Sequence, residues 1–150
     1  MTIFERVMAD MTASQKAGAK DKLAALRLIV NSLKNEAKDL RQPDLTDEQA
    51  VKVLQREVKK RREAIEAFQA GGRSELAAQE QLELGLISPY LPEQLDEAGI
   101  GQLIDQVIKE QVLQTPYDFG RLMGVVMKAL AGRADGQLVR QLVQKKIDSQ

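Results

Sequence analysis

The stretch from Thr46 to Gly72, with the sequence TDEQAVKVLQREVKKRREAIEAFQAGG, decides the fold of this chain. Its apolar residues recur at steps of three and four, which places them on one face of an α-helix. Thr46 and Gln49 have the spacing of a capping box, and the paired glycines can end a helix in the left-handed conformation. The pattern therefore predicts a helix that runs from this cap to about Ala70.

The same helical period continues on both sides of this stretch. Six further helices are expected to begin at residues whose side chains can cap a first turn, namely Thr2, Asp21, Ser74, Asp96, Thr115 and Asp135. Thr2 and Glu5 form another capping-box pattern, and Pro116 fits the first position of its helix. Because no alternating strand pattern or Asn-Gly turn occurs, we predict an all-α, multihelical fold.

A proline-bounded segment divides the expected helices into two groups. Pro89 and Pro92 stop helix propagation, because proline lacks the amide hydrogen and restricts the residue before it. We therefore predict a larger N-terminal subdomain of four helices over residues 1–91 and a smaller subdomain of three helices over residues 92–150.

The composition excludes several classes of chemistry. The 150 residues contain no His and no Cys, which rules out a Ser-His-Asp triad, a thiol nucleophile and an ordinary zinc site. No other catalytic constellation is visible, and we expect no catalytic residue, metal site or cofactor. With five aromatic residues, the chain also lacks an evident stacking platform for single-stranded RNA. Neither a signal peptide nor a membrane-length apolar run is present, so we expect a cytoplasmic location and no membrane partner.

Charge is balanced overall but unevenly distributed. The 22 basic residues equal the 22 acidic ones, while residues 74–98 carry six acidic groups and no basic group. The segments before and after this acidic block are weakly basic. This pattern is not the strong basic excess of a self-sufficient nucleic-acid binder, although it permits local basic patches.

Three stretches together resemble the GatB/YqeY family. They are VLQREVKKRREAIEAF (53–68) with GRSEL (72–76), EQLE (80–83) with YLPEQL (90–95), and GRLMGVVMK (120–128) with GRADG (132–136). The resemblance implies an all-helical protein with a larger N-terminal and a smaller C-terminal part. It also implies a relation to the tail of the B subunit of the glutamine-dependent aspartyl/glutamyl-tRNA amidotransferase, a tail associated with tRNA recognition. The chain matches that tail only.

This resemblance leads to three functional hypotheses. The favoured one is an accessory tRNA-binding module without chemistry of its own. The second is an adaptor that docks another protein, such as an amidotransferase or an aminoacyl-tRNA synthetase. The third is a carbon–nitrogen ligase with glutamine as the amide donor, because free-standing family members often carry that label.

The GRADG turn is the first candidate for contact with RNA. Amides at the start of the following helix can attract an anion, and Arg133 is expected to hold a free guanidinium that can bind a phosphate. The alternative is a tight structural turn, which explains Gly132, Asp135 and Gly136 but not Arg133. The other expected nucleic-acid-binding residues, with Lys146 as a neighbour, are Arg121, Lys128, Arg140, Lys145 and Lys59.

The helix over 46–70 carries two kinds of basic residue. Lys52, Arg56, Lys59 and Lys60 are expected on its outer side, either as a phosphate-binding stripe or as a solvated face with the pairs Lys59–Glu63 and Arg62–Glu66. Arg61 instead falls inside the apolar stripe. A charge there must be paired, and Glu80 or Glu83 of the next helix is the expected structural partner.

Two further features are expected to be structural. Tyr90 and Leu91 are interpreted as a plug at the joint between the subdomains, stiffened by Pro92, with an exposed binding loop as the alternative. Gly120 and Gly124 lie four residues apart on one helix. Because glycine is unfavourable inside a helix, we expect them to permit a close approach of another helix or of a partner.

Overall fold

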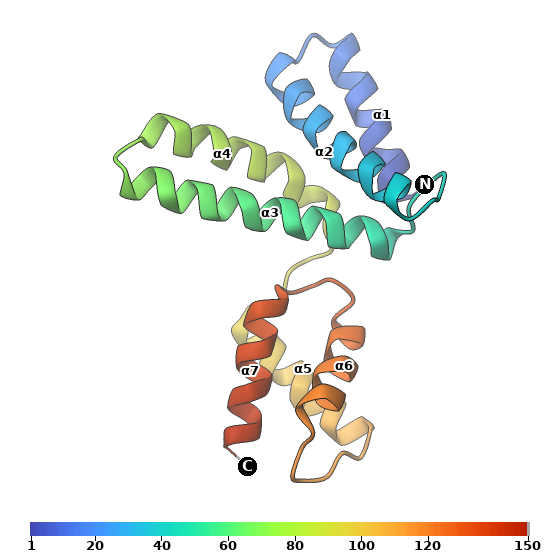
Figure 1. The fold of residues 1–150 in the computed structure, drawn as a ribbon, viewed down its shortest axis with the longest axis vertical. Helices are drawn as coiled ribbons and strands as arrows, with labels where there is room; N and C mark the ends of the chain where they lie inside the picture. The colour runs from blue at the N-terminus through green and yellow to red at the C-terminus, as the bar shows by residue number, and fades with distance from the viewer. Residues whose placement is uncertain (150) are drawn as a thin grey trace. The chain divides into compact units, whose positions relative to one another are not determined.

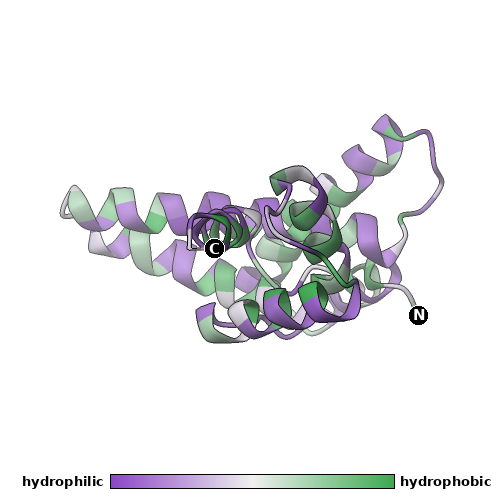
Figure 2. Ribbon diagram, turned by 90° about the horizontal axis from the view of Figure 1, so that it is seen from below, coloured by the Kyte–Doolittle hydropathy of each residue, from purple (hydrophilic) through white to green (hydrophobic). Residues whose placement is uncertain are grey.

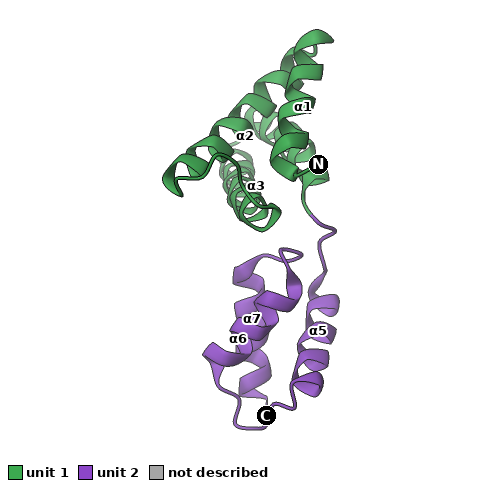
Figure 3. Cartoon of the chain, turned by 90° about the vertical axis from the view of Figure 1, so that its right-hand side faces the viewer, with its two compact units in different colours: residues 1–91 green, residues 92–150 purple. Residues whose placement is uncertain are grey.

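A computed structural model describes residues 1–149, and within this range the chain is helical and without strands (Figure 1). The prediction of an all-α fold is confirmed. The elements are α1 (Ile3–Lys16), α2 (Lys20–Asp39), α3 (Asp47–Ala70), α4 (Ser74–Ile87), the short 3₁₀ helix η1 (Ser88–Tyr90), α5 (Glu97–Glu110), α6 (Phe119–Leu130) and α7 (Gly136–Asp148). They form two compact units, residues 1–91 and residues 92–150, which Figure 3 shows in different colours.

The first unit consists of two helical hairpins, α1–α2 and α3–α4. Its core is aliphatic, because the chain has so few aromatic residues. The largest fully buried side chains are Leu26, Ile29 and Leu33 of α2, Leu54 of α3, and Ile87 of α4. Burial of each such side chain contributes about 1.5–3 kcal/mol. The helices are therefore held mainly by the apolar stripe that their sequence period predicts.

The second unit is a three-helix arrangement of α5, α6 and α7. Its fully buried residues come from all three helices and include Ile100, Ile104, Leu122, Val126 and Val139. Polar and apolar residues alternate around each helix, as the bands of colour in Figure 2 show. Helices α6 and α7 run antiparallel and are joined by residues 131–135 (Figure 1). No helix within residues 1–149 is both long and apolar enough to span a bilayer.

Several of the expected caps are confirmed. The capping box of α3 is complete, since Thr46 accepts a hydrogen bond from the Gln49 amide while the Gln49 side chain accepts one from the Thr46 amide. Asp96 and Asp135 cap α5 and α7. At α1 only the Thr2 half of the expected box forms. There the amide of Ile3 donates instead to Asp47, at 2.8 Å, which ties α1 to the start of α3.

Three expected caps are wrong. Helix α2 begins at Lys20, two residues earlier than a cap at Asp21 predicts, and α4 begins at Ser74, one residue earlier than a cap at Ser74 predicts. Neither helix has a side-chain cap. In both hairpins the preceding helix closes with a backbone hydrogen bond from the N-cap residue of the next helix, Ala19 or Arg73, and neither of these side chains caps the helix that follows. Helix α6 begins at Phe119 rather than after Thr115, because residues 112–118 form a loop that packs Tyr117 against the core.

Candidate nucleic-acid interface

The GRADG segment forms the turn between α6 and α7. Ala131 and Gly132 both have positive φ angles, 50° and 83°, and they reverse the chain after the last residue of α6. Asp135 then accepts a hydrogen bond from the amide of Gln137, at 3.3 Å, and opens α7. The positive φ angle of Gly132 and the cap at Asp135 support the interpretation as a structural turn, whereas Gly136 is the first residue of α7 and does not have a positive φ angle.

Arg133 differs from its expected state, because its guanidinium is not free. Its Nε donates to the carbonyl of Leu130 at 2.9 Å, and its Nη2 donates to the carbonyl of Ala129 at 3.0 Å. The last carbonyls of a helix have no partners within the helix and attract cations, so an arginine in the following turn folds back onto them. Arg133 thus closes the C-terminus of α6 from outside the helix.

The YLPEQL segment meets the GRADG turn inside the second unit. The backbone amide of Leu95 donates to the carbonyl of Arg133 at 2.7 Å. The side-chain amide of Gln94 donates both to the carbonyl of Gly132, at 3.0 Å, and to the carbonyl of Pro92, at 2.8 Å. These two sequence motifs are 38 residues apart, and their contact gives both of them a role in holding this unit together.

The predicted cations of α6 and α7 divide between the two ends of the hairpin. Because the helices are antiparallel, Lys128 and Arg140 lie toward the turn, whereas Arg121 and Lys145 lie toward the opposite end. Seven residues of α-helix separate Arg121 from Lys128, which corresponds to about 10 Å along the axis. The candidate residues therefore form an extended line and not one tight cluster.

Most of these cations are exposed and unpaired. Arg121, Lys128, Arg140 and Lys145 have no carboxylate partner within residues 1–149. Lys146 is the exception, since its ammonium lies 2.8 Å from Asp105 of α5. The hydrogen bond to Asp105 raises the pKa of Lys146. The hairpin therefore presents four cations that are available to an external anion.

The second unit is also polarised in charge. Residues 119–148, which contain α6 and α7, carry six basic and two acidic residues. Residues 92–118, which contain α5 and the flanking loops, carry one basic and six acidic residues. The near-neutral total of this unit therefore conceals a basic hairpin packed on an acidic helix.

Helix α3 uses its basic residues differently. Arg56 pairs with Glu36 of α2 at 2.9 Å, and Lys60 lies 3.8 Å from Glu57. The predicted pairs Lys59–Glu63 and Arg62–Glu66 are not formed among the described residues. Lys59 is exposed without a carboxylate partner. The outer face of α3 is thus partly neutralised by its own unit.

Arg61 is buried in the first unit, with 6% of its surface exposed. Its Nη1 donates to Glu57 at 2.6 Å, and its Nε lies 3.4 Å from Glu83 of α4 without a hydrogen bond. Glu83 is thus confirmed as a partner, whereas Glu80 makes no ion pair with Arg61 in residues 1–149, and Glu57 was missed. Ser32 of α2 also donates to Glu57, at 2.8 Å.

The pKa values of Glu57 and Glu80, two carboxyl groups near Arg61, are shifted in opposite directions. Burial alone would raise the pKa of Glu57, but the hydrogen bonds from Arg61 and Ser32 outweigh it and lower that pKa. Burial and the neighbouring charge of Glu83 raise the pKa of Glu80. Within residues 1–149 no group of three or more acidic side chains is arranged to hold a metal ion.

Tyr90 and Leu91 pack into the core of the first unit. The Tyr90 hydroxyl donates to the carboxylate of Asp10, and burial together with this bond raises the pKa of Tyr90. The Arg6 guanidinium lies 4.9 Å from the centre of the Tyr90 ring and also donates to the carbonyl of Pro89, at 3.0 Å. The exposed binding loop that was the alternative is excluded by the burial of this ring.

The expected close approach at Gly120 and Gly124 does not occur inside the chain. A Cβ atom placed on Gly124 would meet nothing within 4 Å, and one placed on Gly120 would meet only Asp118, at 3.9 Å. Both glycines are exposed on α6. Packing within the second unit therefore does not explain them.

Comparison with known proteins supports the family that the sequence resembles. A family model described as Yqey-like protein matches residues 4–147. The chain is 27% identical over 146 residues to altered inheritance of mitochondria protein 41, mitochondrial, of Pyrenophora tritici-repentis, across 95% of this chain and 80% of that protein. It is 31% identical over 80 residues to uncharacterized protein C22F3.15 of Schizosaccharomyces pombe, across 53% of this chain and 64% of that protein. Since the family model spans nearly every helix of both units, the chain belongs to the YqeY-like protein family.

Proposed function

We propose that this protein is an accessory module that binds tRNA through its α6–α7 hairpin, and that it performs no chemistry of its own. The observation that carries the proposal is the set of unpaired, exposed cations Arg121, Lys128, Arg140 and Lys145 on one hairpin. Phosphate contacts from exposed lysine and arginine supply most of the affinity in sequence-independent binding of nucleic acids.

The charge separation within the second unit supports this choice of surface. The acidic residues of 92–118 would repel a phosphate backbone, whereas the basic hairpin would attract it. A line of cations along two antiparallel helices suits a backbone that runs past the protein better than it suits a small anion. Arg133 is assigned to the turn, because its guanidinium already holds the end of α6.

The test is the binding of bulk tRNA, followed by fluorescence anisotropy across a series of salt concentrations. The double variant Arg121→Gln/Lys145→Gln should bind more weakly and should lower the slope of log affinity against log salt by about one for each lost contact. The matched control is Lys34→Gln/Lys38→Gln, which removes two exposed cations of α2. Equal binding by both double variants, or no salt-dependent binding by the parent protein, would overturn the proposal.

A protein-docking role has one supporting observation. Leu76 and Leu82 of α4 are 45% and 47% exposed, although both belong to a helix whose other leucines are largely covered. Alanine at both positions should leave tRNA binding unchanged and should abolish any association with an amidotransferase or synthetase. The binding of tRNA stays a prediction. The same holds for a protein partner such as an amidotransferase or synthetase, and for the cytoplasmic location.

A further inference from the structure

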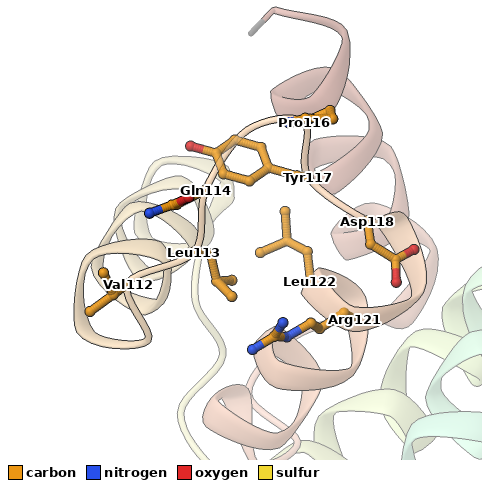
Figure 4. Close-up of a pocket in the computed structure, with 8 residues that line it drawn as sticks. All are labelled: Val112, Leu113, Gln114, Pro116, Tyr117, Asp118, Arg121 and Leu122. Atoms are coloured by element: carbon orange, nitrogen blue, oxygen red, sulfur yellow. The ribbon is translucent and has the colours of Figure 1, made fainter.

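A hollow of about 290 Å³ lies at the end of the second unit, between the loop that follows α5 and the first turn of α6. Figure 4 shows the side chains around it. Its walls are formed by Val112, Leu113, Gln114, Pro116, Tyr117, Asp118, Arg121 and Leu122. Arg121 and Leu122 of its wall belong to the same hairpin that carries the unpaired cations.

The walls combine apolar side chains with an unpaired cation. Leu113, Leu122 and Tyr117 provide the apolar part, and the Arg121 guanidinium has no carboxylate partner in residues 1–149. In Figure 4, Tyr117 and Arg121 lie on opposite sides of the two leucines. A ligand that occupies the hollow can therefore meet an aromatic ring at one end and a positive charge at the other.

Val112 at the rim has an unfavourable conformation. Its φ angle is 51°, in the left-handed region that β-branched residues rarely adopt, because the amide of Leu113 returns to the carbonyl of Ile108 and closes α5. Gly18 and Gly72 occupy the corresponding position after α1 and α3. The Val112 side chain is also 74% exposed, so the core does not compensate for this strain. An exposed apolar side chain in a strained position at the mouth of a pocket is typical of a binding site.

The pocket lies at the end of the hairpin where Lys145 and Lys146 are found. Arg121 of the pocket wall lies in the first turn of α6, and Lys145 and Lys146 lie in the last turn of the antiparallel α7 (Figure 1). A strand of RNA that follows the hairpin cations would thus reach the pocket with its phosphates already engaged. RNA-binding proteins commonly hold unstacked bases against aromatic, apolar and arginine side chains.

We propose that this pocket holds one unstacked nucleotide of a bound RNA, with the base between Tyr117 and the Val112 rim and a phosphate on Arg121. The inference rests on the proposed RNA-binding function and adds a specific position to it. Gln114 supplies an amide that can pair with the edge of a base. Five aromatic residues in the sequence appear too few for a stacking surface, but a single ring in a pocket is enough for one base.

The test follows the amide NMR signals of the full chain during titration with the four ribonucleoside monophosphates. Signals from residues 113–122 should move and saturate, and ribose phosphate, which lacks the base, should bind at least about tenfold more weakly. Val112→Gly should weaken nucleotide binding by about threefold while the melting temperature stays the same or rises, since glycine relieves the strain at this φ angle. If Val112 had only a structural role, this substitution would not lower nucleotide affinity while leaving the melting temperature unchanged or higher.

Two more variants complete the experiment. Arg121→Gln should weaken binding by about tenfold, and the matched control Lys109→Gln, an exposed cation of α5 that does not line the pocket, should bind like the parent. Tyr117→Leu should also weaken nucleotide binding. If the loss of this half-buried ring impairs folding, the results for Val112→Gly and Arg121→Gln still decide the test.

Four outcomes separate the pocket from the hairpin. Pocket signals that do not move with any nucleotide, or that move equally with ribose phosphate, overturn the inference. Saturation by N-acetyl-leucine but not by nucleotides would identify a peptide site and also overturn it. If tRNA binds while nucleotides do not, the hairpin proposal stands and the pocket inference falls. If nucleotides bind at the pocket while tRNA does not bind, the pocket is a nucleotide site, but its assignment to a bound RNA falls together with the hairpin proposal.

Discussion

The α3–α4 and α6–α7 hairpins are both antiparallel helical pairs with many basic residues, yet they pair different shares of those residues with carboxylates. In α3–α4, acidic residues of the same unit engage Arg56, Lys60 and the buried Arg61, while the cations without a carboxylate partner within residues 1–149 are Lys52, Lys59, Arg62 and Arg73. In α6–α7, four cations extend into solvent without a partner. The number of basic residues therefore does not indicate an interface. The positions of the acidic neighbours decide whether a cation stabilises the fold or remains available to a ligand.

Removal of the buried cation should have the largest effect. Arg61→Ala leaves the buried Glu57 and the partly buried Glu83 without the charge of Arg61, and we expect a loss of about 3–5 kcal/mol in the free energy of unfolding. Urea unfolding measures this loss. The matched control in the other hairpin is Arg121→Ala, which should change the free energy of unfolding by no more than about 0.5 kcal/mol. Similar losses for the two variants would remove the distinction between the hairpins.

Arg133 should behave as a structural residue although it lies in the basic hairpin. Arg133→Gln removes two hydrogen bonds to the end of α6, and we expect it to destabilise the protein by about 1–3 kcal/mol. Arg133→Lys should recover less than half of that loss, because an ammonium cannot reproduce the planar fork. Thermal unfolding measures both variants. A stable Arg133→Gln protein that fails to bind tRNA would show instead that this side chain leaves the turn to meet the ligand.

A new carboxylate on α7 should convert an available cation into a paired one. Gln137→Glu lies in the first turn of α7 and three residues before Arg140, so it should stabilise the protein by about 0.3–1 kcal/mol. The same variant should lower tRNA affinity by about threefold, because Arg140 is then partly neutralised. Gln102→Glu, at an exposed position of α5 with no cation three or four residues away, serves as a control for the added negative charge alone. A loss of affinity that is equal in both variants would argue against a specific role for Arg140.

The smallest expected effect concerns Glu80. Its pKa is raised in the folded protein by burial and by Glu83, so its charged form opposes folding at neutral pH. Glu80→Gln should therefore stabilise the protein by about 0.3 kcal/mol at neutral pH. This advantage should shrink as the pH falls through the raised pKa, where the parent carboxyl takes up its own proton. Glu57 should show the opposite sign, because its lowered pKa adds stability that is lost as the pH falls below its ordinary value of 4.5.

The helical fold was accessible from the sequence because its causes are local. The apolar period of residues 46–70 and the capping box at Thr46 act within a few turns of one helix, and the structure confirms both. The caps predicted at Asp21 and Ser74 failed for a related reason. The three-residue turns 17–19 and 71–73 place Ala19 and Arg73 at the N-cap positions, and neither side chain caps the helix that follows.

The candidate site was less accessible, because it depends on long-range partners. The period of α3 placed Arg61 in the apolar stripe, yet it could not show that Glu57, on the same helix, would be its strongest partner. Arg133 was expected to be free, since a sequence does not show that its side chain folds back on α6. The pocket beside Tyr117 was not predicted at all. A signal was present, however, because Val112 occupies a helix end where glycine is the usual residue.

The bonds from Gln94 and Leu95 to the α6–α7 turn have a practical consequence for anyone who divides the gene. A fragment that starts at the first residue of α5 would contain all three helices. It would lack the hydrogen bonds that Gln94 and Leu95 donate to the carbonyls of Gly132 and Arg133. The α6–α7 turn would be less stable in such a fragment than in the intact chain. A fusion partner joined at the start of α5 would not restore the lost hydrogen bonds. A recombinant version of the second unit should therefore begin at Pro92, so that it includes the segment 92–96 that bonds to the α6–α7 turn.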